Sequence, residues 1–336
     1  MNKLCQNPLN AGIEYRSMNT ITKITEPEVT QVNQIRHQLI LILFSIVSTA
    51  LTIQTSHAYH GAPTIAELEN ATYTGIEDGA VTLSNGHWEG PPWEEGAASI
   101  PQVDLAGDMH FTGDLDGDGK DETAAILWQN SGGTGNYVYI AVMNRENGDV
   151  SNLATVLVGD RVRIRGGEIT DGKITLRVLQ AGKGDGMCCP TMLATRNWSL
   201  SNGQLIEEEI EETGTLSLST LEGSKWVLTH MDRNKPVTEG AEVTLDFNGE
   251  RISGKSACNR YSAGIEQGKA ADEIKIGQSM STMMACPDEL MKIEREFLAL
   301  LSRVTGFSFY AGRLALNGNN EDETPFSLLF KPGSTE

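Results

Sequence analysis

The residues best suited to chemistry lie in one short acidic run, GDLDGDGKDE. Asp114, Asp116 and Asp118 alternate along this run, so their carboxylates could converge on one point, and the glycine after the third permits a sharp turn. Lys120 would offer its backbone carbonyl, and Glu122 would complete the set of oxygen ligands. Because hard oxygen ligands at this spacing suit calcium, we expect a calcium ion here as a structural cofactor. The alternative is an acidic turn with no bound ion.

The same run resembles the DxDxDG calcium loops of FG-GAP-type repeats, which lead directly into a β-strand. The residues that follow it, TAAILW at 123–128, are β-like. The run differs from an EF-hand loop, because Ala125 stands where that motif needs a bidentate glutamate. It occurs only once in the sequence, so a propeller built from many such repeats is not expected.

Signatures of catalysis are absent from the sequence. The four histidines after residue 58 form no HExxH or other paired metal-ligand spacing, and no GxSxG nucleophile elbow occurs. We therefore expect that the protein is not an enzyme. A glycosidase needs only two carboxylates and no sequence motif, so an enzyme of that class stays open as an alternative.

Two tryptophans, Trp88 and Trp93, flank a proline pair in the loop-like segment HWEGPPWEEG. Aromatic side chains in a loop could form a binding surface for a sugar, although aromatic residues more often pack in a core. They carry the alternative function, in which the N-terminal part of the chain is a glycan- or protease-directed binding protein or enzyme.

One segment imitates a nucleotide-binding motif. GERISGKS at 249–256 matches the P-loop pattern letter for letter. The chemistry of a P-loop needs a helix directly after it, whose N-terminus faces the phosphate. Here the preceding FNGE is typical of a hairpin turn, and the following residues are typical of a strand and turn. We therefore expect no bound nucleotide.

The composition narrows the classes of partner. The chain has 336 residues, with 26 Lys and Arg against 45 Asp and Glu, and a net charge of −19. No Lys/Arg-rich stripe could neutralise phosphates, so a nucleic-acid partner is not expected.

The length suggests about two domains. The 35 glycines, together with few long helical patterns, favour mainly β structure with many turns.

The longest apolar run covers residues 39–53, which is short for a membrane span of about 20 residues. Small residues stand at the two positions that signal peptidase reads before the bond after Ala58. We therefore expect residues 1–58 to be a signal segment cleaved after Ala58, which leaves an exported, periplasmic or secreted protein without a transmembrane anchor. An uncleaved signal anchor is the alternative, and translation could begin at Met1 or at Met18.

Hydrophobic patterning divides the remaining chain. Short β-like runs separated by Asn-Gly, Asp-Gly and Gly-Gly pairs fill residues 59–200, which predicts an N-terminal β-rich module. Residues 201–220 are acidic and rich in small residues, and we interpret them as a linker. More β-like runs follow in a second domain at 221–333. There, residues 287–304 place apolar side chains on one stripe, which predicts the one clear helix.

Four segments of the second domain carry a family resemblance: KWVL at 225–228, VTLDF at 243–247, CNRY at 258–261 and TMMAC at 282–286. Their order and spacing resemble those of the META domain, the family of the bacterial heat-shock protein HslJ. The resemblance implies a compact antiparallel β domain with one helix, an α+β arrangement. It also implies an exported envelope protein with no known catalytic centre, because members of the family occur in the envelope and are linked to envelope stress.

The N-terminal module, including CCPT at 188–191, resembles uncharacterised modules that accompany META domains in exported bacterial proteins, which implies no activity. The two resemblances together imply an exported, non-catalytic, envelope-associated protein. Its META-like domain would serve interaction or the envelope-stress response, with an unknown envelope protein or ligand as partner. The N-terminal module would be a scaffold that calcium stabilises.

Cysteines in an exported chain favour disulfides, and four of the five remain after residue 58. Cys258 and Cys286 lie in the two signature segments of the META resemblance, and we predict a disulfide between them. Cys188 and Cys189 are adjacent, where a disulfide would need a strained peptide, so we expect a structural or redox-inert role. Whether this adjacent pair is oxidised stays open.

Overall fold

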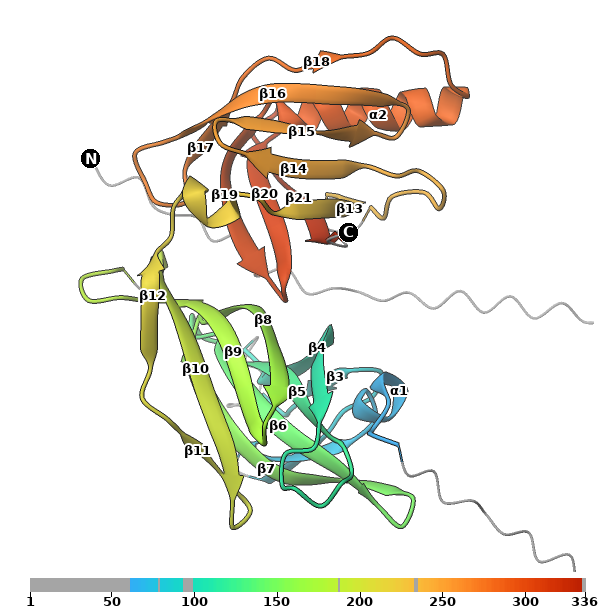
Figure 1. Cartoon of the computed structure of the whole chain (residues 1–336). Helices are drawn as coiled ribbons and strands as arrows, with labels where there is room; N and C mark the ends of the chain where they lie inside the picture. Colours follow the sequence, from blue (N-terminus) through green and yellow to red (C-terminus); the bar gives the residue numbers. More distant parts are fainter. Residues whose placement is uncertain (1–60, 78, 93–98, 187, 233–234, 334–336) are drawn as a thin grey trace, which may run out of the picture. The chain divides into compact units, whose positions relative to one another are not determined.

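The computed structural model describes residues 61–333 except 78, 93–98, 187 and 233–234 (Figure 1). The predicted signal segment and its cleavage site lie outside the described residues. Strands make up most of the regular structure and all pair in antiparallel fashion, which confirms the expected mainly β fold. None of the helices in the described part of the chain is long and apolar enough to cross a membrane.

The described chain begins with a short helix, α1 (Ile65–Leu68), and a two-stranded hairpin, β1 (Thr72–Glu77) and β2 (Gly79–Thr82). Thr64 precedes the helix, and its backbone N–H and its hydroxyl both donate to the Glu67 carboxylate, at 2.8 and 2.7 Å. A carboxylate at this position satisfies backbone donors that a helix N-terminus would otherwise leave unpaired.

A five-stranded sheet follows, in the order β3-β4-β5-β6-β7. Its strands are β3 (His87–Glu89), β4 (Gln102–Gly113), β5 (Glu122–Asn130), β6 (Tyr137–Glu146) and β7 (Asp149–Asp160). β5 is the central strand, and residues 124–127 within it are completely buried. A continuous apolar run, rather than an alternating one, is what a strand covered on both faces requires.

A second sheet has the order β11-β10-β9-β8, and β12 also pairs with β10. Its strands are β8 (Arg163–Thr170), β9 (Lys173–Gln180), β10 (Met192–Ser201), β11 (Gln204–Glu207) and β12 (Glu211–Thr215). Residues 201–220, which we expected to be a linker, thus contain two strands of this sheet. Asn202 and Gly203 both have positive φ and form the two-residue turn between β10 and β11. The acidic composition is compatible with strands because most of these side chains are exposed.

Both faces of the β3–β7 sheet carry a core. Ile126 on β5 belongs to a cluster with Trp198 on β10, so the second sheet covers one face. Leu127, the next residue along β5, belongs to a cluster with Tyr73 on β1, so the N-terminal hairpin and α1 cover the other face. The loop that leads into β5 therefore ends at the most buried strand of the N-terminal module.

The C-terminal strands form a nine-stranded sheet in the order β17-β16-β15-β14-β13-β21-β20-β19, with β18 paired to β16. A 3-10 turn, η1 (Leu218–Leu221), precedes them. The strands are β13 (Lys225–Met231), β14 (Thr244–Asn248), β15 (Arg251–Ser256), β16 (Asn259–Gln267), β17 (Ile274–Ile276), β18 (Met280–Ser281), β19 (Val304–Tyr310), β20 (Arg313–Asn319) and β21 (Pro325–Pro332). The two ends of this order meet, because Phe307 N–H donates to Asp272 O at 2.9 Å. The sheet therefore curves around its core.

The predicted helix over 287–304 is confirmed as α2 (Asp288–Leu301). Phe297 is completely buried in the core of the curved sheet, as the apolar stripe predicts. Glu294 is also buried, with 6% of its surface exposed, and an apolar stripe does not predict this carboxylate.

The segment that imitates a P-loop forms a hairpin. Gly249 has a φ of 60° in the turn between β14 and β15, and the residues after Ser256 turn directly into β16. A P-loop needs the N-terminus of a helix at that point, and a strand occupies it instead. The strand and turn predicted for this segment are confirmed.

Candidate metal centre

The acidic run forms the loop between β4 and β5. One carboxylate oxygen from each of Asp114, Asp116 and Glu122 lies within 4.8 Å of the other two. These are three of the five residues that the sequence predicts as calcium ligands. Convergence follows from the loop's position: it leaves one strand and enters the paired neighbouring strand, so its first and last carboxylates face each other.

Backbone donors fix the loop around two of these carboxylates. Asp114 accepts hydrogen bonds from Gly117 N at 2.7 Å and Gly119 N at 3.1 Å, which closes the turn. Glu122 accepts one from Leu115 N at 3.0 Å, across the base of the loop. Gly117 and Gly119 both have positive φ, near 81° and 84°, where glycine is the residue without a steric penalty.

Asp118, a fourth predicted ligand, lies outside the converging group. Asp118 accepts a hydrogen bond from Lys120 Nζ at 2.9 Å and one from Lys120 N at 2.8 Å. The side-chain hydrogen bond from Lys120, helped by the backbone one, holds the pKa of Asp118 below its ordinary value. The carboxylate of Asp118 therefore pairs with Lys120 and does not join the three converging carboxylates.

Glu122 is the unusual member of the cluster, because only 3% of its surface is exposed. Burial raises the pKa of this carboxyl group, and the nearby charges of Asp116, Asp118 and Asp114 raise it further. The hydrogen bond from Leu115 N opposes this shift. Among the described residues, no lysine or arginine forms an ion pair with any of the three converging carboxylates. The cluster therefore gathers three carboxylates with no ion pair to a cationic side chain in the part of the chain that the structure describes.

A cavity of about 180 Å³ opens beside the loop. Its lining is mostly polar and comes from the loop, from the end of β6 and from the start of the described chain: Gly61, Asp116, Asp118, Lys120, Asp121, Glu122, Asn144, Arg145 and Glu146. Water and a cation can therefore reach Glu122 from this side, although the residue is buried as a whole.

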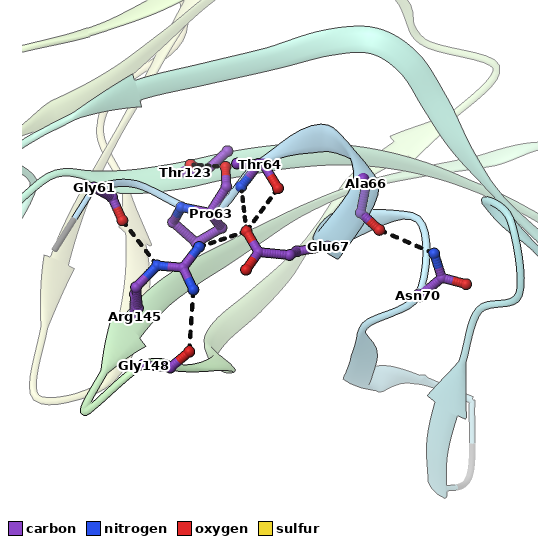
Figure 2. A network of polar contacts seen from close by, with 9 residues as sticks. All are labelled: Gly61, Pro63, Thr64, Ala66, Glu67, Asn70, Thr123, Arg145 and Gly148. Carbon is purple, nitrogen blue, oxygen red and sulfur yellow. Dashed lines mark hydrogen bonds and ion pairs between the residues drawn. The ribbon is translucent and has the colours of Figure 1, made fainter. Parts of the chain in front are cut away.

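A network of polar contacts holds the first described residues next to this cavity (Figure 2). Arg145, at the end of β6, donates to the Glu67 carboxylate, to Gly61 O at 3.0 Å and to Gly148 O at 3.1 Å. Thr123 Oγ1, next to Glu122, donates to a backbone carbonyl in the same segment at 3.3 Å. The side-chain hydrogen bond from Arg145 lowers the pKa of Glu67 to about 2. The network therefore fixes the segment before α1 against β5 and β6.

Of the two tryptophans that could form a sugar-binding surface, only Trp88 lies within the described residues. Trp88 lies on β3, is half-buried and packs against the core cluster beneath α1. Trp93 lies outside the described residues. Packing accounts for Trp88, and the binding surface proposed for the two side chains stays a prediction.

The disulfide predicted between Cys258 and Cys286 is present, with a Cα–Cα distance of 6.0 Å. It joins the turn before β16 to the segment before α2. Next to it, Asn259 Oδ1 accepts hydrogen bonds from Thr282 Oγ1 and Met284 N, both at 2.7 Å. The two signature segments of the C-terminal domain are therefore joined by a covalent bond and by hydrogen bonds.

The buried carboxylate of α2 belongs to the same network. Glu294 accepts hydrogen bonds from Asn259 N at 2.7 Å, from Ser256 Oγ at 2.9 Å and from Asn259 Nδ2 at 3.0 Å. Sequence reasoning missed this residue, because a glutamate within an amphipathic helix is typically solvent-exposed. Only the position of Asn259, opposite the helix in space, reveals its role.

The family resemblance implied a compact antiparallel β domain with one helix, and the C-terminal sheet with α2 has this arrangement. Residues 219–329 match the META domain family. The META domain accounts for the C-terminal sheet, α2 and both cysteines of the disulfide.

Two solved structures resemble about a third of this chain. An NMR structure of a protein from Burkholderia xenovorans is 22% identical, with a TM-score of 0.29, and the match covers 35% of this chain and 87% of that chain. A second NMR structure is also 22% identical, with a TM-score of 0.28, and the match covers 34% of this chain and 94% of that one. No curated protein matches the chain.

Proposed function

We propose that the β4–β5 loop binds one calcium ion, which stabilises the N-terminal module of an exported, non-catalytic protein. The META domain, of the HslJ-like type, is the interaction domain of this protein and serves a partner in the envelope. The observation that carries the calcium site is the burial of Glu122 beside Asp114 and Asp116, with no cationic side chain paired to them among the described residues.

The charge of this cluster favours a cation. Burial and like charges both disfavour the ionised form of Glu122, as the direction of its pKa shift indicates. A bound positive ion would offset this cost. Calcium is the ion that fits, because all available ligands are hard oxygens and the loop is exposed enough to admit water as further ligands.

The number of ligands is sufficient. Calcium takes about 6 to 8 oxygen ligands, and three carboxylates can supply up to about six of them when they bind in a bidentate manner. Asp118 and the Lys120 carbonyl lie within the same loop and could complete the shell. The Asp118–Lys120 ion pair is solvent-exposed, and such pairs contribute little stability, so its loss on calcium binding is tolerable.

The ion has a structural role in this proposal. Glu122 is the first residue of β5, the central strand, whose next residues are completely buried. An ion that joins the start of β5 to the end of β4 reduces fraying at the edge of the core. A closed shell of oxygen ligands leaves no open position for a reacting group, which agrees with a non-catalytic role.

Thermal melts of the chain from Tyr59 onwards, with millimolar calcium and with a chelator, test the site. We expect calcium to raise the melting temperature, and we expect the double variant Asp114→Asn, Asp116→Asn to lose this response. Asp171→Asn is the matched control, because Asp171 is an exposed turn residue with a φ of 53°, a conformation that asparagine also tolerates. An equal response to calcium in all three proteins, or none in the natural sequence, would contradict the proposal.

A further inference from the structure

The loop between β9 and β10 presents two sulfur atoms side by side. Cys188 and Cys189 are both outside the disulfide of the META domain, and their Sγ atoms are 2.7 Å apart. At this distance the two sulfur atoms are in direct contact, but they do not form the S–S bond of about 2.0 Å. Cys188 is exposed and Cys189 is half-buried. The pair is therefore both close enough to react internally and accessible from solvent.

The loop is held by its own hydrogen bonds. The Asp185 carboxylate accepts bonds from Gly182 N at 2.8 Å and Thr191 N at 2.7 Å, which closes the loop at both ends. Cys189 N donates to Gly186 O at 2.9 Å within it. Beyond the loop, β9 and β10 are paired directly. The two thiols are therefore positioned by a closed loop on a sheet.

We propose that Cys188 and Cys189, for which the sequence favoured a redox-inert role, are a reversible redox site. The pair forms a disulfide by exchange with a small disulfide such as oxidised glutathione. In the first step, the thiolate of Cys188 attacks one glutathione sulfur, and glutathione thiolate leaves. In the second, the thiolate of Cys189 attacks the Cys188 sulfur of this mixed disulfide, and the second glutathione leaves. The protein loses two electrons and two protons, and the glutathione disulfide is reduced to two thiols.

Accessibility decides the order of the two cysteines. Attack on an external disulfide requires a thiolate that the reagent can reach, so the exposed Cys188 reacts first. The second step is intramolecular, and Cys189 already lies beside the sulfur that it attacks. Cys189 is therefore the resolving cysteine.

The bond between neighbours is expected to be more easily reduced than the disulfide of the META domain. Adjacent Cα atoms across a trans peptide are about 3.8 Å apart, which is below the usual disulfide range of about 4.4 to 6.8 Å, so the bond is strained. Cys258 and Cys286 have a Cα–Cα distance of 6.0 Å, which lies within the usual range. Cys258 is also buried, with 5% of its surface exposed. Strain and exposure both make a disulfide labile.

The test equilibrates the chain from Tyr59 onwards with glutathione buffers of graded ratio, blocks thiols with iodoacetamide and maps the peptides by mass. We expect the peptide with Cys188 and Cys189 to be unalkylated and lighter by two hydrogen atoms in oxidising buffers, and doubly alkylated in reducing ones. The Cys258–Cys286 bond should persist in buffers that open the adjacent pair. A pair that stays doubly alkylated throughout, or that joins to other cysteines, overturns the proposal.

Two single variants test the order of attack. Cys189→Ser should accumulate glutathione on Cys188, and Cys188→Ser should carry about tenfold less adduct on Cys189, because that residue is half-buried. Equal adducts on both variants would overturn the assigned order. Phenylarsine oxide, which needs two close thiols, should bind the reduced protein with one equivalent and neither variant. Because this binding needs no oxidation, its absence in the natural sequence would overturn the close pairing itself.

Discussion

Two glutamates of this protein are buried to a similar degree, yet their surroundings are opposite. Glu294 in the META domain has 6% of its surface exposed and accepts three hydrogen bonds from Ser256 and Asn259. Glu122 in the N-terminal module has 3% exposed, accepts a hydrogen bond from Leu115 N and faces two further carboxylates. The first carboxylate is satisfied by donors of the protein itself, and the second is not.

The groups that surround a buried carboxylate indicate its role. A charge surrounded by donors is an internal anchor, because each donor offsets part of the cost of desolvation. A charge surrounded by like charges needs an external cation or a proton. The same residue type therefore joins a helix to a sheet in one domain and is proposed to bind calcium in the other.

The largest effect is expected for Glu294→Ala. This change leaves Asn259 N without an acceptor, whereas Ser256 Oγ keeps Asn259 O and Asn259 Nδ2 keeps Met284 O. An unsatisfied buried group costs about 1 to 3 kcal/mol, and two further hydrogen bonds to the carboxylate are lost, so we expect a loss of about 3 kcal/mol. Urea unfolding with and without calcium should show the same loss in both conditions. Glu296→Ala is the control on the same helix, because its ion pair with Lys235 is exposed and is expected to contribute less than about 1 kcal/mol. If the two variants lose the same unfolding free energy, the buried Glu294 stabilises the protein no more than the Glu296 ion pair, and the prediction is wrong.

A smaller effect on stability is expected for Glu122→Gln, and in the calcium-free protein it is a gain rather than a loss. Because its pKa is raised in the folded protein, Glu122 destabilises the calcium-free protein progressively as the pH rises from its ordinary value of 4.5 through the raised pKa. The variant should lack this fall, and calcium, which binds the carboxylate form, should oppose it in the natural sequence. Urea midpoints at a series of pH values, with chelator and with calcium, measure both effects. If the stability of the natural sequence rises across that range without calcium, the ionised form of Glu122 is not destabilised by its surroundings, and the prediction is wrong.

The smallest effect is expected for Glu67→Gln, in the network beside the cavity. Its pKa is lowered to about 2, chiefly by the hydrogen bond from Arg145, so its contribution is present above pH 4.5 and is lost as the pH falls from 4.5 through about 2. The variant should lose less stability than the natural sequence over that acidic range. Glu69→Gln, on the same turn but outside the network of Figure 2, should behave like the natural sequence. Identical acid midpoints for all three would show that the network contributes no stability.

The sequence predicted the elements that depend on neighbouring residues. The apolar spacing over 287–304 predicted α2, and the β-like run after the acidic loop predicted a strand, now β5. The segment 201–220 was interpreted from composition as a linker, although its Asn-Gly turn marks the hairpin that it forms with β10. Charge content indicates exposure, and exposed edge strands are as acidic as linkers.

The candidate site was predicted in part. The spacing of Asp114, Asp116 and Glu122 placed them in one loop, and the structure brings them together. Asp118 was assigned to the same point because it continues the alternation, whereas the structure pairs it with Lys120. A spacing rule describes which residues are close along the chain, but not which partner a flexible side chain takes.

Sequence patterns are sufficient to predict the acidic loop, the strand that follows it, the helix of the META domain and the adjacent cysteines, because these depend on residues a few positions apart. The contact of Arg145 with Glu67, 78 positions away, and that of Glu294 with Asn259, 35 positions away, arise only when the chain folds. The burial of Glu122 likewise depends on the tertiary structure. Such contacts arise when sheets close over a core, and the hydrophobic pattern specifies which faces are buried without specifying which polar groups meet across them.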